Sequence, residues 1–195
     1  LGIGVVLDRA DPCDVLVTGG RYKFDDLAPG ALVGTSSLRR KSQIAALRPD
    51  LEFEDLRGNV TTRLEHVHHG RFDAIVLAAA GLQRLGLAEA IDYAFSTHSV
   101  VPAVGQGAIG IESRDDDADI NGLIAGLNSP TTQTCVAAER AMSRALAGSC
   151  EIPLAAHPVL DGEVLSITGL VASLDGATIL REQLSGTRTN AEQTG

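Results

Sequence analysis

The stretch ALVGTSSLRRKSQIAALRPDLEFEDLRGN, residues 31–59, decides the expected fold. Its first three residues form a short apolar run, and Gly34-Thr-Ser36 follows as a turn. An amphipathic segment comes next and ends at Arg48, before Pro49. This pattern predicts a strand followed by a helix. Residues 51–56 predict a second strand, and Asn59 is a suitable N-cap for a second helix. Strands and helices in alternation indicate parallel βαβ units with right-handed crossovers.

The alternation continues to about residue 87. Val60, Leu64 and Val67 share one face of the second expected helix, and Gly70 is suited to end it. Residues 74–78 are an apolar run typical of a buried strand, and residues 80–85 predict a short helix. Residues 102–113 are expected to form a glycine-rich bend that enters a strand.

The last third of the chain has a different pattern. Ser129 and Pro130 predict the start of a helix over residues 130–147, with Gly148 as its terminator. Asp161-Gly162 and Asp175-Gly176 are hairpin signals that separate three β-like runs. We therefore expect an antiparallel sheet with the helix packed on it, a small α+β domain.

Composition restricts the functional class. The net charge of −9 argues against a nucleic-acid surface, and no stretch of the sequence reaches the length of a membrane span. The three cysteines show no CxxC spacing, which argues against a disulfide framework and a zinc site and favours a reducing cytoplasm. Arginine far exceeds lysine, which suits bidentate binding of carboxylates but is equally explained by a GC-rich genome.

Arginines occupy helix starts, where the helix dipole disfavours cations. Arg39 and Arg40 fall in one first turn, Arg63 falls near the start of the next helix, and Arg57 ends the strand between them. In an open parallel sheet these positions share the carboxyl edge, where ligands bind. Together with helix amides and hydroxyl groups they predict an exposed anion site; the hydroxyl groups are those of Thr35, Ser36 and Ser37. The alternative is that the arginines are solvated or paired with Glu54 and Asp55.

Cys150 follows a predicted helix end among small residues, so its thiol could be an accessible nucleophile. The alternative is an inert apolar side chain. The segment Gly105–Gly110 matches the dinucleotide-binding GxGxxG pattern, but it enters a strand instead of opening a helix, and we reject that interpretation. His66, His68 and His69 lack further ligands at suitable spacing, so no metal site is expected.

Five segments, in order and spacing, resemble the porphobilinogen deaminase family. They are Gly34-Thr-Ser-Ser-Leu-Arg-Arg40, Leu56-Arg-Gly-Asn-Val60 with Arg63, Leu82-Gln-Arg-Leu-Gly86, Pro102-Ala-Val-Gly-Gln-Gly107, and Ala138-Glu-Arg-Ala141 through Gly148-Ser-Cys150. The resemblance implies a transferase of porphyrin, tetrapyrrole and heme biosynthesis. It joins porphobilinogen units head to tail into hydroxymethylbilane and releases ammonia, on a dipyrromethane primer bound to Cys150 through a thioether.

The resemblance also implies the residues that bind the acidic side chains of the primer and the growing chain. Ser37, Arg39, Arg40, Arg57 and Arg63 match the family's gripping residues, Thr35, Ser36 and Gly58 belong to the same motifs, and Arg84 and Gln106 are secondary members of the cleft. The mechanism implied is protonation of the aminomethyl group, loss of ammonia and attack by the primer. The family's catalytic aspartate, in a Lys-Asp motif, is expected upstream of Leu1.

The implied fold has two domains of the type II periplasmic-binding-protein kind and a third α+β domain that carries the cysteine. Residues 1–8 and 104–126 are expected to be a remnant of the first, 12–101 the second and 128–195 the third. The chain is thus expected to be a fragment, inactive alone, of a monomeric cytoplasmic enzyme that binds no nucleic acid or membrane. The alternatives are a non-catalytic two-lobed binding module for a carboxylated molecule, and a thiol hydrolase in which His157 serves Cys150 as base.

Overall fold

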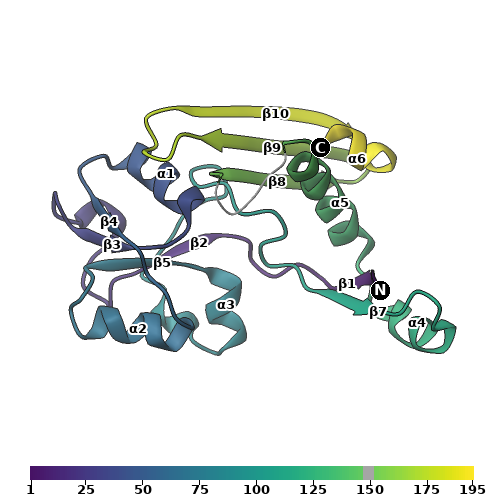
Figure 1. The fold of residues 1–195 in the computed structure, drawn as a ribbon, viewed down its shortest axis with the longest axis horizontal. Helices are drawn as coiled ribbons and strands as arrows, with labels where there is room; N and C mark the ends of the chain where they lie inside the picture. Colours follow the sequence, from purple (N-terminus) through teal and green to yellow (C-terminus); the bar gives the residue numbers. More distant parts are fainter. Residues whose placement is uncertain (147–151) are drawn as a thin grey trace.

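A computed structural model of the chain describes residues 1–146 and 152–195 (Figure 1). Within these residues the strands form three sheets: five strands in the order β4-β3-β5-β2-β6, three in the order β10-β9-β8, and the pair β1-β7. Helices accompany each sheet, so the fold is mixed α/β, as the sequence predicts. No helix in the described part of the chain is long and apolar enough to cross a membrane.

The five-stranded sheet contains the predicted βαβ units. Strands β3 (Leu32–Gly34), β4 (Glu52–Glu54) and β5 (Ala74–Ala78) are parallel, and they are joined by α1 (Leu38–Leu47) and α2 (Val60–His68). Helix α3 (Ala79–Arg84) follows β5. Strand β2 (Asp14–Val17), which the sequence pattern does not predict, runs antiparallel to β5 and to β6 (Tyr93–Ala94).

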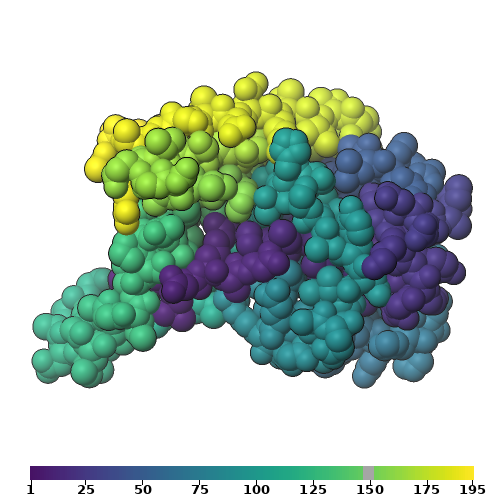
Figure 2. All heavy atoms as spheres, turned by 180° about the vertical axis from the view of Figure 1, so that it is seen from behind, coloured from purple at the N-terminus to yellow at the C-terminus, as the bar shows by residue number. Residues whose placement is uncertain are grey.

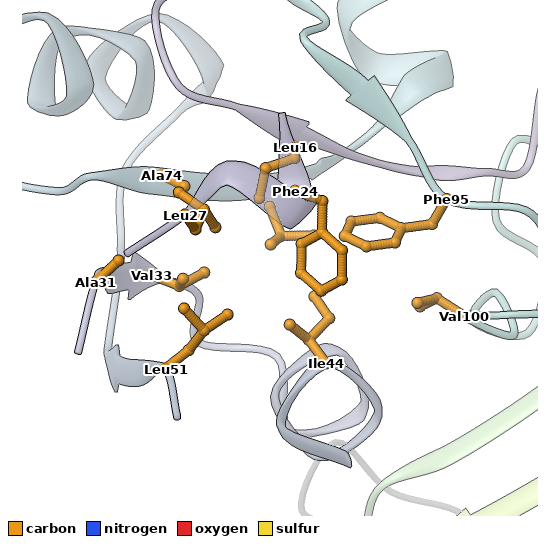
Figure 3. Close-up of a cluster of buried hydrophobic side chains, with 11 residues drawn as sticks. Leu16, Phe24, Leu27, Ala31, Val33, Ile44, Leu51, Ala74, Phe95 and Val100 are labelled. Atoms are coloured by element: carbon orange, nitrogen blue, oxygen red, sulfur yellow. The ribbon is translucent and has the colours of Figure 1, made fainter. Parts of the chain in front are cut away.

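Two apolar clusters cover the faces of this sheet. Successive side chains of a strand point to opposite faces, so Leu16 joins one cluster while Val15 and Val17 join the other. Figure 3 shows the first cluster, where Ile44 of α1 packs among residues of the sheet and its connections. Helix α1 is therefore fixed against the sheet by its own core residue.

The C-terminal sheet is an antiparallel meander, as predicted. Its strands are β8 (Leu154–Asp161), β9 (Val164–Ala172) and β10 (Ile179–Thr187), with Gly162 and Gly176 in left-handed conformation at the two turns. Helix α5 (Pro130–Ala145) packs on it through Cys135 and Ala138. The helix ends two residues before the predicted Ala147, because Leu146 already has the non-helical backbone of a C-cap.

The remaining elements lie at the ends and connections. Strand β1 (Gly2–Val6) pairs antiparallel with β7 (Gly110–Ser113), and α4 (Ala118–Ile124) follows β7. Figure 2 shows this region projecting from one end, with the C-terminal sheet along one side. Short helical turns complete the chain: η1 (Phe24–Asp26), η2 (Ala88–Ala90), η3 (Ala125–Leu127), η4 (Arg188–Asn190) and α6 (Ala191–Thr194).

Candidate functional site

A cavity of about 510 Å³ lies at the N-terminus of α1. One wall consists of residues 35–40 and Arg63, and thus contains six of the predicted binding residues: Thr35, Ser36, Ser37, Arg39, Arg40 and Arg63. The opposite wall, which the sequence pattern does not predict, comes from residues near the C-terminal sheet: Ala103, Val104, Ser143, Ile152 and Leu154. The site therefore lies between the two larger sheets.

Helix α1 begins at this cavity because Ser37 caps it. The Ser37 side chain accepts a hydrogen bond from the amide of Arg40. The amides of Leu38 and Arg39 precede the first intrahelical bond, which the amide of Lys41 donates to the Ser37 carbonyl. The first turn contains no acidic residue. The helix end thus keeps its partial positive charge toward the cavity.

Both arginines of the first turn of α1 are bound by one buried carboxylate, Asp14, at the start of β2. Its Oδ2 lies 2.6 Å from Nη1 of Arg39, and its Oδ1 accepts hydrogen bonds from Nη2 of Arg39 at 3.2 Å and from Nε of Arg40 at 2.8 Å. Burial acts to raise the pKa of Asp14, but the two guanidinium charges outweigh it and hold this pKa below its ordinary value. One anion faces two cations, so the cluster keeps a net positive charge.

The expectation that the first-turn arginines are exposed is wrong: the exposed fraction is 12% for the side chain of Arg40 and only 6% for that of Arg39. Its Nη1 also donates to the Val101 carbonyl at 2.8 Å, and its Nη2 donates to Oε1 of Gln106 at 3.3 Å. The protein itself therefore uses both terminal nitrogens of Arg39. This side chain fixes the start of α1 and has little donor capacity left for a ligand.

Arg40 differs from Arg39 in this respect. Its Nη1 donates to the Val76 carbonyl at 3.1 Å, whereas its Nη2 has no hydrogen-bond partner among the described residues. Burial lowers the pKa of Arg40, and the like charges of Arg39 and Arg63 add to that effect against the opposing carboxylate. The charged form of Arg40 would therefore be stabilised by a bound anion.

The alternative pairing of these arginines with Glu54 and Asp55 is wrong. Glu54 pairs with Arg71, its Oε1 lying 3.0 Å from Nη2. The carboxylate that pairs with Arg39 and Arg40 is Asp14, which lies earlier in the chain and on a different strand.

The remaining predicted residues are spread around the cavity. Nε of Arg63 donates a hydrogen bond to the Gly58 carbonyl at 2.8 Å, so the terminal nitrogens of Arg63 are available to a ligand in the cavity. Arg57 is exposed. Gly58 has a φ of 107°, which glycine adopts readily. Arg84 and Gln106 support the walls instead of lining the cavity.

The contacts of these two residues show how they act. Arg84 donates to the Gly107 carbonyl at 2.7 Å, and Gln106 donates to Oδ1 of Asp14 at 3.0 Å and to the Pro12 carbonyl. Gly105 and Gly107 have positive φ in the bend before β7, so the prediction that this segment enters a strand instead of opening a helix is confirmed.

Cys150 lies outside the described residues. In the sequence, Ser143 precedes it and Ile152 follows it by two positions, and both line the cavity. His157, the base of the thiol-hydrolase alternative, has a pKa lowered to about 4 by burial and by the charge of Arg9. Its Nδ1 has no partner among the described residues, so no group there orients the ring as that alternative needs.

Comparison with known proteins identifies the family of the chain. The family model described as porphobilinogen deaminase, dipyromethane cofactor binding domain, matches residues 1–122, and the model of the porphobilinogen deaminase C-terminal domain matches residues 133–195. This chain belongs to the porphobilinogen deaminase family. Porphobilinogen deaminases from Chromobacterium violaceum and Bordetella parapertussis are 47% and 49% identical to it over 193 residues. The match covers 99% of this chain and 62% of each relative, so the chain spans less than two thirds of their length.

Proposed function

We propose that the protein containing this chain joins porphobilinogen units head to tail into hydroxymethylbilane, with release of ammonia, on a dipyrromethane primer bound to Cys150. It would act as a monomer in the cytoplasm, in porphyrin and heme biosynthesis. The observation that carries the proposal is the net positive cavity at the N-terminus of α1, whose arginine wall lies inside the region that matches the family's cofactor-binding domain.

The donor set of the cavity fits a primer whose pyrrole units carry carboxylates. Nη2 of Arg40, the terminal nitrogens of Arg63 and the first amides of α1 all donate, and none of them has a carboxylate partner among the described residues. Val104 and Leu154 on the opposite wall offer apolar contact to pyrrole rings. The primer supplies the free pyrrole carbon to which each unit is added; the residues of this chain bind, space and orient the acidic side chains.

Proton transfer needs a group that the described cavity walls lack. No carboxylate is among the described residues that line the cavity. Asp14 stands behind Arg39 and Arg40 with a lowered pKa, and both of its oxygens already accept hydrogen bonds. It is therefore an anion throughout the neutral range and cannot protonate an aminomethyl group. We assign that step to the aspartate of the family's Lys-Asp motif, outside this chain.

We assign residues 1–8 and 104–126 to a first domain, 12–101 to a second and 128–195 to a third. The pairing of β1 with β7 supports the first assignment, since it joins segments more than 100 residues apart. The parallel units of the five-stranded sheet support a second domain of the type II periplasmic-binding-protein kind.

The 195-residue chain expressed alone is expected not to convert porphobilinogen, because it holds anions on one wall without an acid to activate the substrate. The assay incubates the purified chain with porphobilinogen and measures absorbance after cyclisation and oxidation of the product, with the full-length protein as control. Turnover by the chain at the rate of the control would show that the acid lies within these 195 residues.

Intact-mass measurement tests the attachment at Cys150. The full-length protein is expected to carry the added mass of a dipyrromethane, which Cys150→Ala removes and Cys13→Ala, at a partly exposed thiol, retains. An unmodified wild-type protein would favour the alternative, a non-catalytic module that binds a carboxylated molecule. Added mass retained by Cys150→Ala would move the attachment to another residue.

A further inference from the structure

The turn between β9 and β10 rests directly on α1 (Figure 1). Gly176, in this turn, has a φ of 74° and is buried. A Cβ at this position would overlap the carbonyl oxygen of Ser42 and lie 3.3 Å from the amide nitrogen of Ala46. The backbones of turn and helix are thus as close as the absence of a side chain allows.

Helix α1 is held in place on the side away from this contact. Gln43 accepts a hydrogen bond from the Val101 amide at 2.7 Å and donates one to the Val101 carbonyl at 3.0 Å. Ile44, the next residue, is fully buried in the cluster of Figure 3, and Arg39 is bound to Asp14 one turn earlier. An added atom at Gly176 would therefore displace the C-terminal sheet rather than the helix.

Displacement of the turn would also move the cavity wall at Leu154. Leu154, the first residue of β8 and part of the cavity wall, pairs with Val171, which pairs with Leu180 at the start of β10. The turn and Leu154 therefore lie at the same end of the sheet. Because the three strands are hydrogen-bonded in continuous register, they move together.

We propose that Gly176 is a positioning residue: the contact of its bare backbone with α1 sets the distance between the C-terminal wall of the cavity, at Leu154, and the donors of Arg40. The consequence for catalysis rests on the proposed function. The contact with Ser42 itself does not.

The test compares Gly176→Ala with Gly162→Ala in the full-length protein. Gly162 is also the glycine of an Asp-Gly hairpin, with a φ of 57°, but a Cβ there meets no atom within 4 Å. Both variants bear the strain of a positive φ, and Gly176→Ala alone adds the collision. We expect KM for porphobilinogen to rise about tenfold in Gly176→Ala, since small misplacements in a site have large effects, and to stay within about twofold in Gly162→Ala.

Asn at position 176 separates collision from strain. Asn tolerates a positive φ better than Ala but is larger, so Gly176→Asn is expected to raise KM at least as much as Gly176→Ala. A KM restored to the wild-type value by Asn would overturn the proposal, as would equal KM values for Gly176→Ala and Gly162→Ala.

Two further measurements keep the inference testable. Asp175 is exposed and holds the turn by accepting hydrogen bonds from Ser173 and from the Ala177 amide at 3.1 Å, so Asp175→Ala loosens the turn without adding an atom. If Gly176→Ala does not fold, an unchanged KM in Asp175→Ala overturns the proposal and a raised KM supports it. Hydrogen exchange reports on the displaced end of the C-terminal sheet, residues 154–156 and 169–171. Exchange there is expected to accelerate in Gly176→Ala and not in Gly162→Ala, and this holds even if the wild-type protein lacks turnover and the proposed function fails. Equal exchange in the two variants would overturn the contact itself.

Discussion

Asp14→Asn is expected to lower the free energy of unfolding of the full-length protein by about 3–5 kcal/mol, the range for removing one partner of a buried ion pair. Asp14 is fully buried and bound to both Arg39 and Arg40. Asn preserves the shape of the side chain but removes the charge and directs an amide donor at guanidinium donors. The two arginines would remain buried without an anion.

The pH dependence of this effect has a definite sign. The pKa of Asp14 is lowered in the folded protein by Arg39 and Arg40, which together outweigh the effect of burial. Its contribution to stability is therefore complete above the unfolded pKa of about 3.9 and is lost as the pH falls through the lower folded pKa. The difference between wild type and Asp14→Asn should stay constant from pH 5 to 8, roughly, and narrow below about pH 4.

Urea unfolding at several pH values measures both effects. The matched control is Asp25→Asn, an exposed aspartate of η1 in the same part of the chain, which should change stability by no more than about 0.5 kcal/mol. Equal losses in the two variants, or an Asp14 difference that grows on acidification, would contradict the role of Asp14 as the anion between the arginines.

Local signals in the sequence were sufficient for most of the fold. Asn59 and Ser129 cap helices as predicted, because a cap depends on residues within one turn of it. The hairpins at Gly162 and Gly176 were predicted for the same reason. The end of α5 was misplaced, since Leu146 adopts a non-helical backbone without any glycine at that position.

The cavity was predicted only on one side. Its arginine wall follows from motifs that lie close together in the sequence, whereas Asp14 meets Arg39 across 25 positions and Val104 and Leu154 come from other segments. One signal for Asp14 was present: it opens the otherwise apolar run Asp-Val-Leu-Val, and a carboxylate beside buried residues requires a partner. The partner itself cannot be identified without the antiparallel placement of β2.

Arg39 and Arg40 are adjacent in the sequence, but replacing each by Gln is expected to affect different properties, stability for Arg39 and ligand binding for Arg40. Arg39→Gln removes the two bonds to Asp14 and the bonds to Val101 and Gln106. It also leaves buried acceptors unsatisfied, so the loss should be mainly in stability, about 3–5 kcal/mol. Arg40→Gln leaves Asp14 with its bidentate partner Arg39, and the cluster then holds one cation for one anion. Stability should change by only about 1 kcal/mol.

The loss in Arg40→Gln should appear in ligand binding. Nη2 of Arg40 has no hydrogen-bond partner among the described residues, whereas both terminal nitrogens of Arg39 are bound, and the variant also removes the excess positive charge. A lost charge-assisted contact to a carboxylate costs about 1.5–3 kcal/mol, which corresponds to a fall in kcat/KM for porphobilinogen of roughly 10- to 150-fold. The measurement is steady-state kinetics beside urea unfolding for both variants, with Arg71→Gln as a control at an exposed arginine that does not line the cavity. Equal kinetic and stability losses in Arg39→Gln and Arg40→Gln would mean that the two arginines share one role, and the division between anchor and ligand donor would be wrong.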